Sequence, residues 1–291
     1  MDEVHVIGSA HWDCVARSDA APQPGDDLPG RIVRRPGGVA FNIAAGMAEA
    51  GLPVELIASI GRDGDGAALI GAIEAGGIGT RYLHRAEATD RYLAIEGPDG
   101  ALFAAVADCR ALDAAGPALL ASWRSAVAGA AMVVLDGNLP DSVAAALPFA
   151  EAFPREIALV AASPAKATSL HALIAGIEIG AGAGEILVFA NLAEAEALCE
   201  KRFENSLDAS RALAALTGTA VVTAGPAAAA YTSIDGLSHC AVPPARQGST
   251  LGAGDAFVAG FLACRRDPFQ GVEAQFQAGF AAAARSMQHP L

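Results

Sequence analysis

Lysine is almost absent from this 291-residue chain, which has it only at Lys166 and Lys201. Lysine and arginine together number 19, against 32 aspartates and glutamates, so the formal net charge is −13. A surface this acidic repels phosphate backbones and anionic lipids, which argues against a nucleic-acid duplex or a membrane as the main partner. A small-molecule substrate remains compatible with it, because a local cationic pocket can lie inside an acidic protein.

Paired cysteines and long apolar runs are also missing. The cysteines are odd in number and widely spaced, and no two form a CxxC pair; they are Cys14, Cys109, Cys199, Cys240 and Cys264. This pattern indicates reduced thiols in a cytoplasmic protein rather than disulfides or a zinc site. The acidic N-terminus MDEVHVIGSA is unlike a signal peptide, and no uninterrupted apolar run is long enough to cross a bilayer.

The chain does have an alanine-rich, globular composition, with 53% hydrophobic and 18% charged residues. Strand-like runs lie at 4–10, 53–61, 131–137, 155–163, 185–191 and 219–225. Helix-like segments alternate with them at 36–52, 63–78, 140–152, 166–176 and 192–201. A hairpin is expected at 227–243, with helices from there to the C-terminus. Repeated strand–helix units predict a parallel sheet with helices on both faces.

Two early segments, approximately 11–36 and 81–107, do not fit this alternation. Their β-compatible pieces lie at 30–35, 81–86 and 91–106, and the last contains a turn at Gly97-Pro98-Asp99-Gly100. We expect them to form a small separate sheet on one side of the core. The chain shows no internal repeat and no interdomain linker, so residues 1–291 are expected to form one domain with these two segments inserted as a lid.

The stretch GSTLGAGDAFVAGFL (248–262) joins a glycine-rich turn to a helix. Gly252, Ala253 and Gly254 can point successive backbone N–H groups into one concavity, and the positive end of the helix adds to it, which suits a phosphate. Asp255 is then either a plain N-cap or a base that accepts a proton from an attacking hydroxyl beside this anion hole. A Walker A sequence is absent, so any nucleotide chemistry needs a different phosphate cradle.

Four motifs together resemble those of the ribokinase-like (PfkB) carbohydrate and nucleoside kinases. They are PGGVAFNIAAGMAEAGLPVELIASIGRDGDG (36–66), NLAE (191–194), VVTAGPAAAA (221–230) and STLGAGDAFVAGFL (249–262). They follow the order found in that family, and the resemblance covers essentially the whole chain. It implies a three-layer α/β/α fold with a mostly parallel central sheet and a small β-sheet lid.

On the sugar side, the resemblance makes Asp255 the catalytic base and the backbone of residues 252–254 the anion hole. It also implies a sugar pocket lined by Asp13, Gly37, Gly38 and Asn42. A carboxylate can accept hydrogen bonds from both hydroxyls of a diol, and an amide supplies a donor and an acceptor. Taken singly, Asp13 would be interpreted as a turn residue, Gly37-Gly38 as a helix-entry turn and Asn42 as a half-buried polar residue of a helix.

On the nucleotide side, the resemblance gives Asn191 and Glu194 the task of organising Mg²⁺ and phosphates, through water because Mg²⁺ keeps much of its hydration shell. It also implies that ATP lies near Thr223 and Gly225. Taken alone, Asn191 and Glu194 could be a helix cap with a first-turn acid. Lys166, just after a strand, is either a solvated surface amine or a contact to a nucleotide phosphate.

The chain departs from the family's pattern in several places. Ser249 stands where an acid helps many members hold a monovalent cation, which leaves K⁺ activation open. An alanine replaces the glycine expected soon after Gly225, the turn AASPAK (161–166) lacks an aspartate, and the tail after 280 is short. These departures keep a second class open, a catalytically weak protein that binds a sugar or nucleotide as a sensor. Retention of Asp255, Asn42 and Asp13 argues against it.

The expected reaction is ATP-dependent phosphorylation of a primary hydroxyl on a furanose sugar or ribosyl nucleoside. The stretches GSAHWD, RYLAIEGPDGALFAAVADCRAL and MVVLDGNLP are most similar to pseudouridine kinases, with ribokinase- and fructokinase-type sugar kinases as the alternative. No GxGxxG follows the first strand, which argues against a dinucleotide-dependent oxidoreductase. The apolar strands expected at 91–95 and 102–106 would suit a homodimer formed through the lids.

Overall fold

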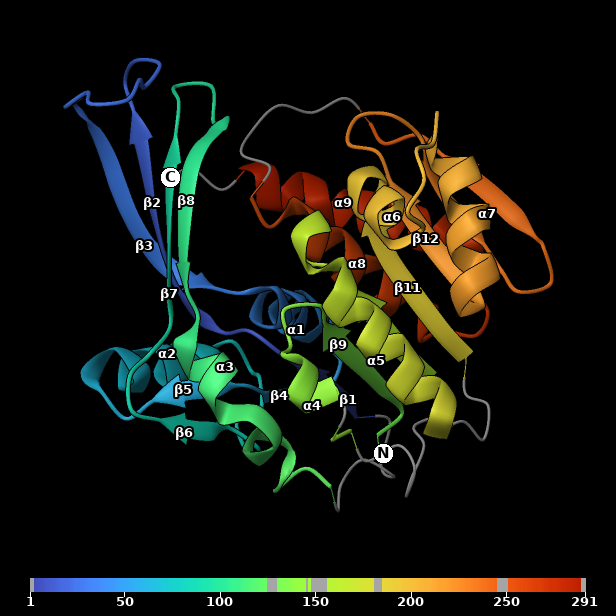
Figure 1. Ribbon diagram of the computed structural model, residues 1–291, viewed down its shortest axis with the longest axis horizontal. Helices are drawn as coiled ribbons and strands as arrows, with labels where there is room; N and C mark the ends of the chain where they lie inside the picture. The colour runs from blue at the N-terminus through green and yellow to red at the C-terminus, as the bar shows by residue number, and fades with distance from the viewer. Residues whose placement is uncertain are drawn as a thin grey trace.

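The computed structural model describes residues 3–124, 130–144, 146–147, 156–180, 185–244 and 251–288. Its main sheet has eight strands in the order β14-β13-β12-β11-β10-β9-β1-β4 (Figure 1). Their bounds are β1 Val4–Ile7, β4 Val54–Ile57, β9 Met132–Asp136, β10 Glu156–Val160, β11 Glu185–Asn191, β12 Thr219–Thr223, β13 Ala229–Thr232 and β14 Ser238–Ala241. The strands from β12 to β4 pair in parallel, and the hairpin β13–β14 joins the edge antiparallel. The predicted parallel sheet is confirmed.

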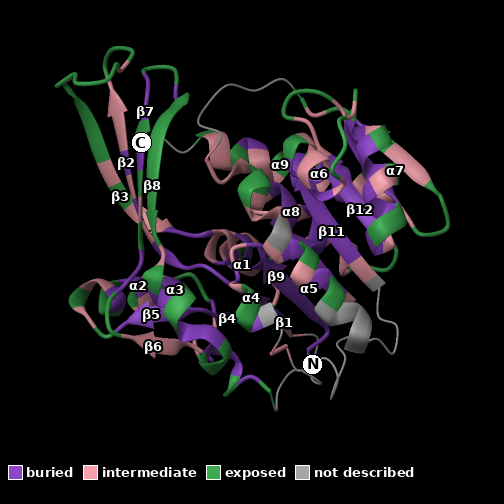
Figure 2. Cartoon of the chain, in the orientation of Figure 1, coloured by how far each residue is buried: buried purple, intermediate pink, exposed green. Residues whose placement is uncertain are grey.

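The sheet separates two hydrophobic cores, because successive side chains of a strand point to opposite faces. On β9, Met132 and Val134 face one core, whereas Val133 and Leu135 face the other. The first core is covered by α1 Val39–Glu49, α2 Gly64–Ala75, α8 Ala253–Arg265 and α9 Val272–Gln288. The second is covered by α3 Arg110–Ala115, α4 Asp141–Ala144, α5 Ala167–Gly180, α6 Leu192–Leu198 and α7 Ser206–Thr217. Figure 2 shows the buried strands between these layers, so the predicted α/β/α fold is confirmed.

A second sheet of four strands stands to one side of the main one (Figure 1). Its order is β3-β2-β7-β8, with bounds β2 His11–Ser18, β3 Gly30–Gly37, β7 Arg91–Glu96 and β8 Leu102–Asp108. We call this sheet the lid. Asp65 on α2 ties it to the core, since its carboxylate lies 2.6 Å from Nη2 of Arg34 and 2.8 Å from Nη2 of Arg91. Its backbone carbonyl also accepts a 2.9 Å hydrogen bond from Trp12.

Several boundaries differ from the sequence-based expectations. The run 53–61 splits into β4 and β5 (Ser59–Gly61), and β5 pairs with β6 (His84–Ala86) in a separate two-stranded sheet. Residues 81–90, expected within the lid, therefore lie outside its strands. Of the helix expected at 140–152, α4 accounts for 141–144, while 145 and 148–152 lie outside the described residues.

Two helices, α7 and α3, were not predicted, and they differ in how clearly the sequence signals them. For α7 the signals are local, because Asn205 accepts a hydrogen bond from the backbone of Asp208 and Gly218 ends the helix. For α3 the cap comes from afar, since the buried carboxylate of Asp90 accepts the N–H groups of residues 111 and 112. No helix within the described ranges is long and apolar enough to cross a membrane.

Candidate active site

A cavity of about 1330 Å³ lies between the lid and the carboxyl ends of β1, β9 and β10. Ser9, Asn138 and Ser163, which follow these three strands, line it together with residues of α1 and α8. Crevices at the carboxyl ends of parallel strands are the usual ligand sites of open α/β sheets. The volume exceeds the ~300–1,000 Å³ typical of small-molecule sites, because the cavity continues between α1, α8 and α9 past Glu49 and Arg285.

The helix α8 begins at this cavity, and the residues at its start show whether Asp255 is the N-cap. Gly252 is the N-cap, in the left-handed conformation with φ 79°, and no side chain caps the helix. The first N–H groups of a helix have no partner within it, so residues 253–255 can offer theirs to an anion. Asp255 lies in the first turn rather than at the N-cap, so the plain N-cap interpretation is wrong.

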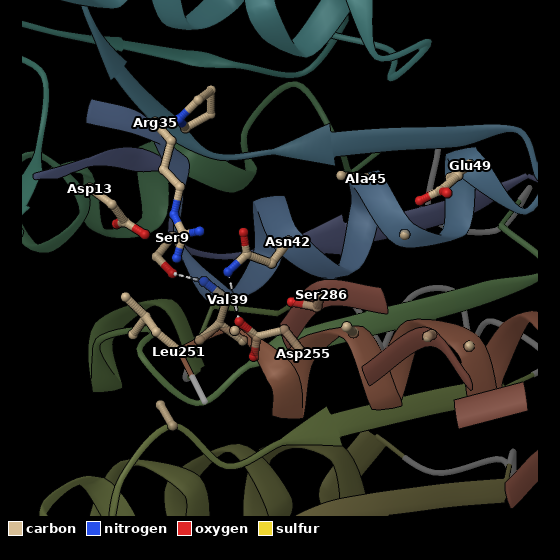
Figure 3. Close-up of a pocket in the computed structure, with 18 of the residues that line it drawn as sticks. Ser9, Asp13, Arg35, Val39, Asn42, Ala45, Glu49, Leu251, Asp255 and Ser286 are labelled. Carbon is tan, nitrogen blue, oxygen red and sulfur yellow. Dashed lines mark hydrogen bonds between the residues drawn. The ribbon is translucent and has the colours of Figure 1, made fainter. Parts of the chain in front are cut away.

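The carboxylate of Asp255 instead reaches across to α1. Its Oδ2 accepts a 2.8 Å hydrogen bond from Nδ2 of Asn42, a residue 213 positions earlier in the chain (Figure 3). The pKa of Asp255 is raised to about 7, chiefly by burial; the Asn42 hydrogen bond lowers it, and the charges of Asp136, Asp13 and Glu194 contribute to the rise. The site thus holds a carboxyl group that ionises near neutral pH, as a general base requires.

One row of side chains from the lid forms the roof of the cavity. The strands pair so that Arg35, Asp13, Tyr92 and Ala107 lie side by side on β3, β2, β7 and β8, and all four line the cavity. Below them, Leu251 packs against Val15 and Ala94 on the inner face of the lid. The lid is therefore in contact with the segment that leads into α8.

Asp13 lies deep in this roof, with 5% of its surface exposed. Nδ1 of His11 is 3.0 Å from Oδ1 of Asp13, but the two atoms are not in hydrogen-bond geometry, and both are buried without a hydrogen-bond partner among the described residues. Next to them, a Cβ added to Gly37 would lie 2.2 Å from the other carboxylate oxygen. A buried carboxylate oxygen with a free lone pair indicates a place for a hydroxyl donor from outside the chain.

The entry into α1 is fixed by a glycine and a serine. Gly38 has φ 103°, and a Cβ there would lie 2.5 Å from the carbonyl oxygen of Ser9. The hydroxyl of Ser9 accepts the N–H of Val39 over 3.0 Å, and its carbonyl accepts the N–H of Phe41. These contacts aim Asn42 at Asp255. Asp13, Gly38 and Asn42 line one cavity, whereas Gly37 lies against Asp13 and is not among the residues that line it.

Asp136 is a central residue that the sequence analysis did not include in the site. It is 1% exposed and accepts hydrogen bonds from the backbone and hydroxyl of Ser9, at 2.9 and 2.5 Å. Its other oxygen accepts two bonds of 2.8 Å from the backbone and side chain of Asn138. The signal was present as an acid at the end of a buried strand, in the segment Asp136-Gly137-Asn138.

Lys166 belongs to the same network. Its Nζ donates a 2.6 Å hydrogen bond to Oδ1 of Asn138, and the half-buried side chain lines the cavity. The interpretation of Lys166 as a solvated surface amine is therefore wrong. Its contact with a nucleotide phosphate stays a prediction.

Asn191 and Glu194 form a capping box at the start of α6. The backbone of Asn191 donates to Oε2 of Glu194 over 2.8 Å, and the backbone of Glu194 donates to Oδ1 of Asn191 over 3.0 Å. Burial raises the pKa of Glu194 to about 7, while the hydrogen bonds with Asn191 lower it. Within the described ranges, no group of three or more His, Cys, Asp or Glu is arranged to hold a metal ion. The side-chain oxygens of Asn191 and Glu194 fit an Mg²⁺ ion that keeps its own water ligands and contacts the protein through them.

The remaining predicted residues lie along the same edge of the sheet or outside the described part. Thr223 is the register partner of Asn191 at the ends of β12 and β11, and Gly225 follows with φ 58°. Neither is among the residues that line the described cavity. Ser249 lies outside the described residues, so the question of a monovalent cation stays as the sequence left it.

Comparison with known proteins agrees with this arrangement. The pfkB family carbohydrate kinase model matches residues 1–291. The pseudouridine kinase of Escherichia coli (strain K12) is 29% identical over 149 residues, which are 50% of this chain and 47% of that protein. The ribokinase of Bacillus subtilis (strain 168) is 33% identical over 84 residues, 28% of this chain and 29% of that protein. The chain therefore spans less than half the length of these curated relatives.

Solved structures are similar over nearly the whole chain. A carbohydrate kinase from Agrobacterium tumefaciens has a TM-score of 0.79 at 29% identity, over 99% of this chain and 92% of that chain. An Arabidopsis thaliana ribokinase complexed with ribose and ATP has a TM-score of 0.80 at 20% identity, over 99% of this chain and 93% of that chain. The second similarity concerns the fold alone.

Proposed function

This chain belongs to the pfkB family of carbohydrate kinases, and on that premise we propose that it transfers the γ-phosphoryl group of ATP to a primary hydroxyl of a sugar or ribosyl nucleoside. The observation that carries the proposal is the position of Asp255. Its carboxylate lines the cavity in the first turn of α8 and ionises near neutral pH. A proton acceptor and an anion hole thus share one helix end.

In the proposed reaction, Asp255 accepts the proton of the attacking hydroxyl. The oxygen of that hydroxyl bonds to the γ-phosphorus while the bond from the γ-phosphorus to ADP breaks and ADP leaves. The backbone N–H groups at the start of α8 stabilise the charge of the transferred group. Asp13 orients the sugar by accepting hydrogen bonds from the sugar's hydroxyls. Leu251 under the lid excludes water from the reacting atoms. Asn191 and Glu194 would hold Mg²⁺ through water, and the ion supplies neutralisation of phosphate charge.

Pseudouridine is the single substrate that we put first, and ribose is the runner-up. The support is the similarity of half the chain to a pseudouridine kinase and of a shorter part to a ribokinase.

The test is an ATP-consumption screen over ribose, fructose, adenosine, cytidine and pseudouridine, with Asp255→Asn alongside. We expect turnover with at least one acceptor and its loss in the variant. Turnover surviving in Asp255→Asn contradicts the base assignment, and tight binding without turnover favours the sensor. A KCl series in the same screen tests K⁺ activation.

The role of Glu194 can be tested without breaking the helix cap. Glu194→Gln keeps an oxygen that accepts the backbone N–H of Asn191, so the capping box is retained while the charge is lost. We expect the Mg²⁺ concentration for half-maximal activity to rise, with the melting temperature nearly unchanged. An unaltered Mg²⁺ dependence would remove Glu194 from the metal assignment.

We also propose that two lids pair in a homodimer. The outer face of the lid exposes several apolar side chains, among them Ile32 at 75%, Leu93 at 43% and Val106 at 64%. An exposed apolar sheet face of this kind marks an interaction surface. Light scattering after gel filtration should give a dimer that Leu93→Asp converts to a monomer. Leu216→Asp on α7, where the leucine is 53% exposed, is the matched control and should leave the dimer intact.

A further inference from the structure

Arg35 is a cation in the roof of the cavity with no protein partner in the described part of the chain. It is half-buried at the end of β3, it lines the cavity, and Figure 3 shows its guanidinium extending into the space bordered by Ser9 and Asn42. None of the ion pairs or side-chain hydrogen bonds found within the described ranges involves its guanidinium. The proposed reaction gives it no task.

Three other arginines of the lid are paired, and Arg31 is exposed to solvent outside the cavity, so Arg35 differs from all of them. Arg17 binds Glu96, with Nη2 and Oε2 2.7 Å apart, and Arg34 and Arg91 both bind Asp65. Asp13 is the direct cross-strand neighbour of Arg35, yet no ion pair of 4.0 Å or less joins them. The roof therefore presents a donor and an acceptor side by side, each with its hydrogen-bonding capacity unused by the other.

A substrate that fills the cavity displaces the water that hydrates Arg35. A guanidinium left unpaired in such a site is unfavourable, whereas its planar fork of N–H donors matches a pair of sp² oxygens. Asp13 carries the opposite preference, because a carboxylate accepts hydrogen bonds from hydroxyls. The two groups thus select different parts of one molecule, hydroxyls at Asp13 and carbonyl or carboxylate oxygen at Arg35.

Building on the proposed kinase function, we infer that Arg35 is a specificity-determining residue that binds an sp² oxygen of the substrate, away from the hydroxyl at Asp255. A nucleobase carbonyl and the carboxylate of an acidic sugar are two sources of this oxygen. Ribose in its ring form has neither, so it leaves Arg35 unpaired. The preferred substrate is accordingly a ribose derivative that carries a nucleobase carbonyl or a carboxylate rather than the free sugar.

The test compares three ligands that share the same primary hydroxyl: pseudouridine, D-ribonate and ribose. Dissociation constants are measured by calorimetry without ATP, and KM and kcat are measured with ATP. The variants are Arg35→Met, Arg35→Lys, and Arg31→Met as a control on the same strand, where the arginine is exposed and outside the cavity. Melting temperatures of all variants check that the lid remains folded.

We expect Arg35→Met to weaken whichever oxygen-bearing ligand the wild type prefers by about 10- to 100-fold, the range for losing a hydrogen bond to a charged group. Ribose binding should change less than about 3-fold, and Arg31→Met should change neither. Arg35→Lys should recover part of the loss with D-ribonate, where charge suffices, and less with pseudouridine. The ligand that loses affinity identifies the source of the oxygen.

Two results would overturn the inference. One is a wild type that binds neither pseudouridine nor D-ribonate more tightly than ribose. The other is an Arg35→Met variant that weakens all three ligands equally or none of them. These results are separable from failure of the kinase proposal. Binding that depends on Arg35 without any turnover contradicts only the kinase function, and turnover with a selectivity that Arg35→Met leaves unchanged contradicts only the role of Arg35.

Discussion

The hydrogen bond from Asn42 to Asp255 sets the pH range in which the proposed base is ionised. Burial is the largest influence on Asp255 and raises its pKa to about 7, with the charges of three neighbouring carboxylates acting in the same direction. The 2.8 Å bond from Nδ2 of Asn42 is the opposing interaction, because it favours the ionised form. We expect Asn42→Ala to raise the pKa of Asp255 further and to move the acid limb of the pH–activity profile to higher pH.

The size of this shift follows from the strength of one bond. A hydrogen bond to an ionised group contributes about 1.5–3 kcal/mol, and one pKa unit corresponds to about 1.4 kcal/mol, so the pKa rises by about 1–2 units. A carboxyl group with a pKa of about 7 is half ionised at pH 7, whereas the variant would be ionised to about 1–10%. Activity at pH 7 should therefore fall about 5- to 50-fold from ionisation alone, and this part of the loss should be recovered above about pH 9.

The assay is kcat/KM measured from about pH 5.5 to about pH 10. Asn42 is also expected to bind the sugar, so the absolute loss is ambiguous and the midpoint of the acid limb is the informative quantity. Asp13→Asn supplies a control of opposite sign, because the charge of Asp13 raises the pKa of Asp255 and its removal should lower the midpoint. An unchanged midpoint in Asn42→Ala, or shifts of the same sign in both variants, would refute the reasoning.

Four further variants test other contacts. Asp136→Ala leaves the donors of Ser9 and Asn138 unsatisfied in a buried site and should reduce the free energy of unfolding by about 2–4 kcal/mol in urea denaturation. Gly37→Ala places a Cβ 2.2 Å from the carboxylate of Asp13, so we expect a higher KM for the sugar with an unchanged KM for ATP. Asp65→Ala removes two partly exposed ion pairs that hold the lid and should raise the sugar KM about 3-fold, less so at high salt, where the wild-type pairs are already screened. The free energy of unfolding of Asp255→Asn should exceed that of the wild type at pH 8 by about 4 kcal/mol at most, and the two should agree near pH 4. The reason is that the pKa of Asp255 is higher in the folded chain than in the unfolded chain, so the wild type loses stability as the pH rises from about 4 to about 8.

The parts of the fold that the sequence predicted are those specified by local patterns. Buried apolar runs gave the strands of the main sheet, and a glycine pair before an alanine-rich helix gave α1. The helix α7 carried local signals that the sequence analysis overlooked, whereas two other differences depend on distant groups. The helix α3 is capped by Asp90, 20 residues before its first residue, and β5 leaves the main sheet to pair with β6. A pattern read along the chain carries no information about such partners.

The candidate site shows the same division. Asp13, Asn42 and Asp255 could be assigned from motifs, but their contacts could not, because the hydrogen bond from Asn42 joins residues 213 positions apart. Asp136 was missed because the local pattern shows only an acid at the end of a buried strand and does not show its partners. Its role depends on Ser9, 127 positions away, whose two hydrogen bonds to it exist only in the folded chain.

The distribution of charge distinguishes a site built for a ligand from a set of helix caps. The pKa of Asp255 is raised by the charges of Asp136, Asp13 and Glu194, so three other carboxylates lie close enough to repel a negative charge on Asp255. Such repulsion in a partly buried cavity lowers the stability of the empty protein, and a cap would gain nothing from it. In the proposed reaction, a substrate that donates hydroxyls and a nucleotide that arrives with a divalent cation would relieve the repulsion. Gly252 already occupies the N-cap of α8 with φ 79°, so the position of Asp255 is better explained by the group it would deprotonate than by the helix it begins.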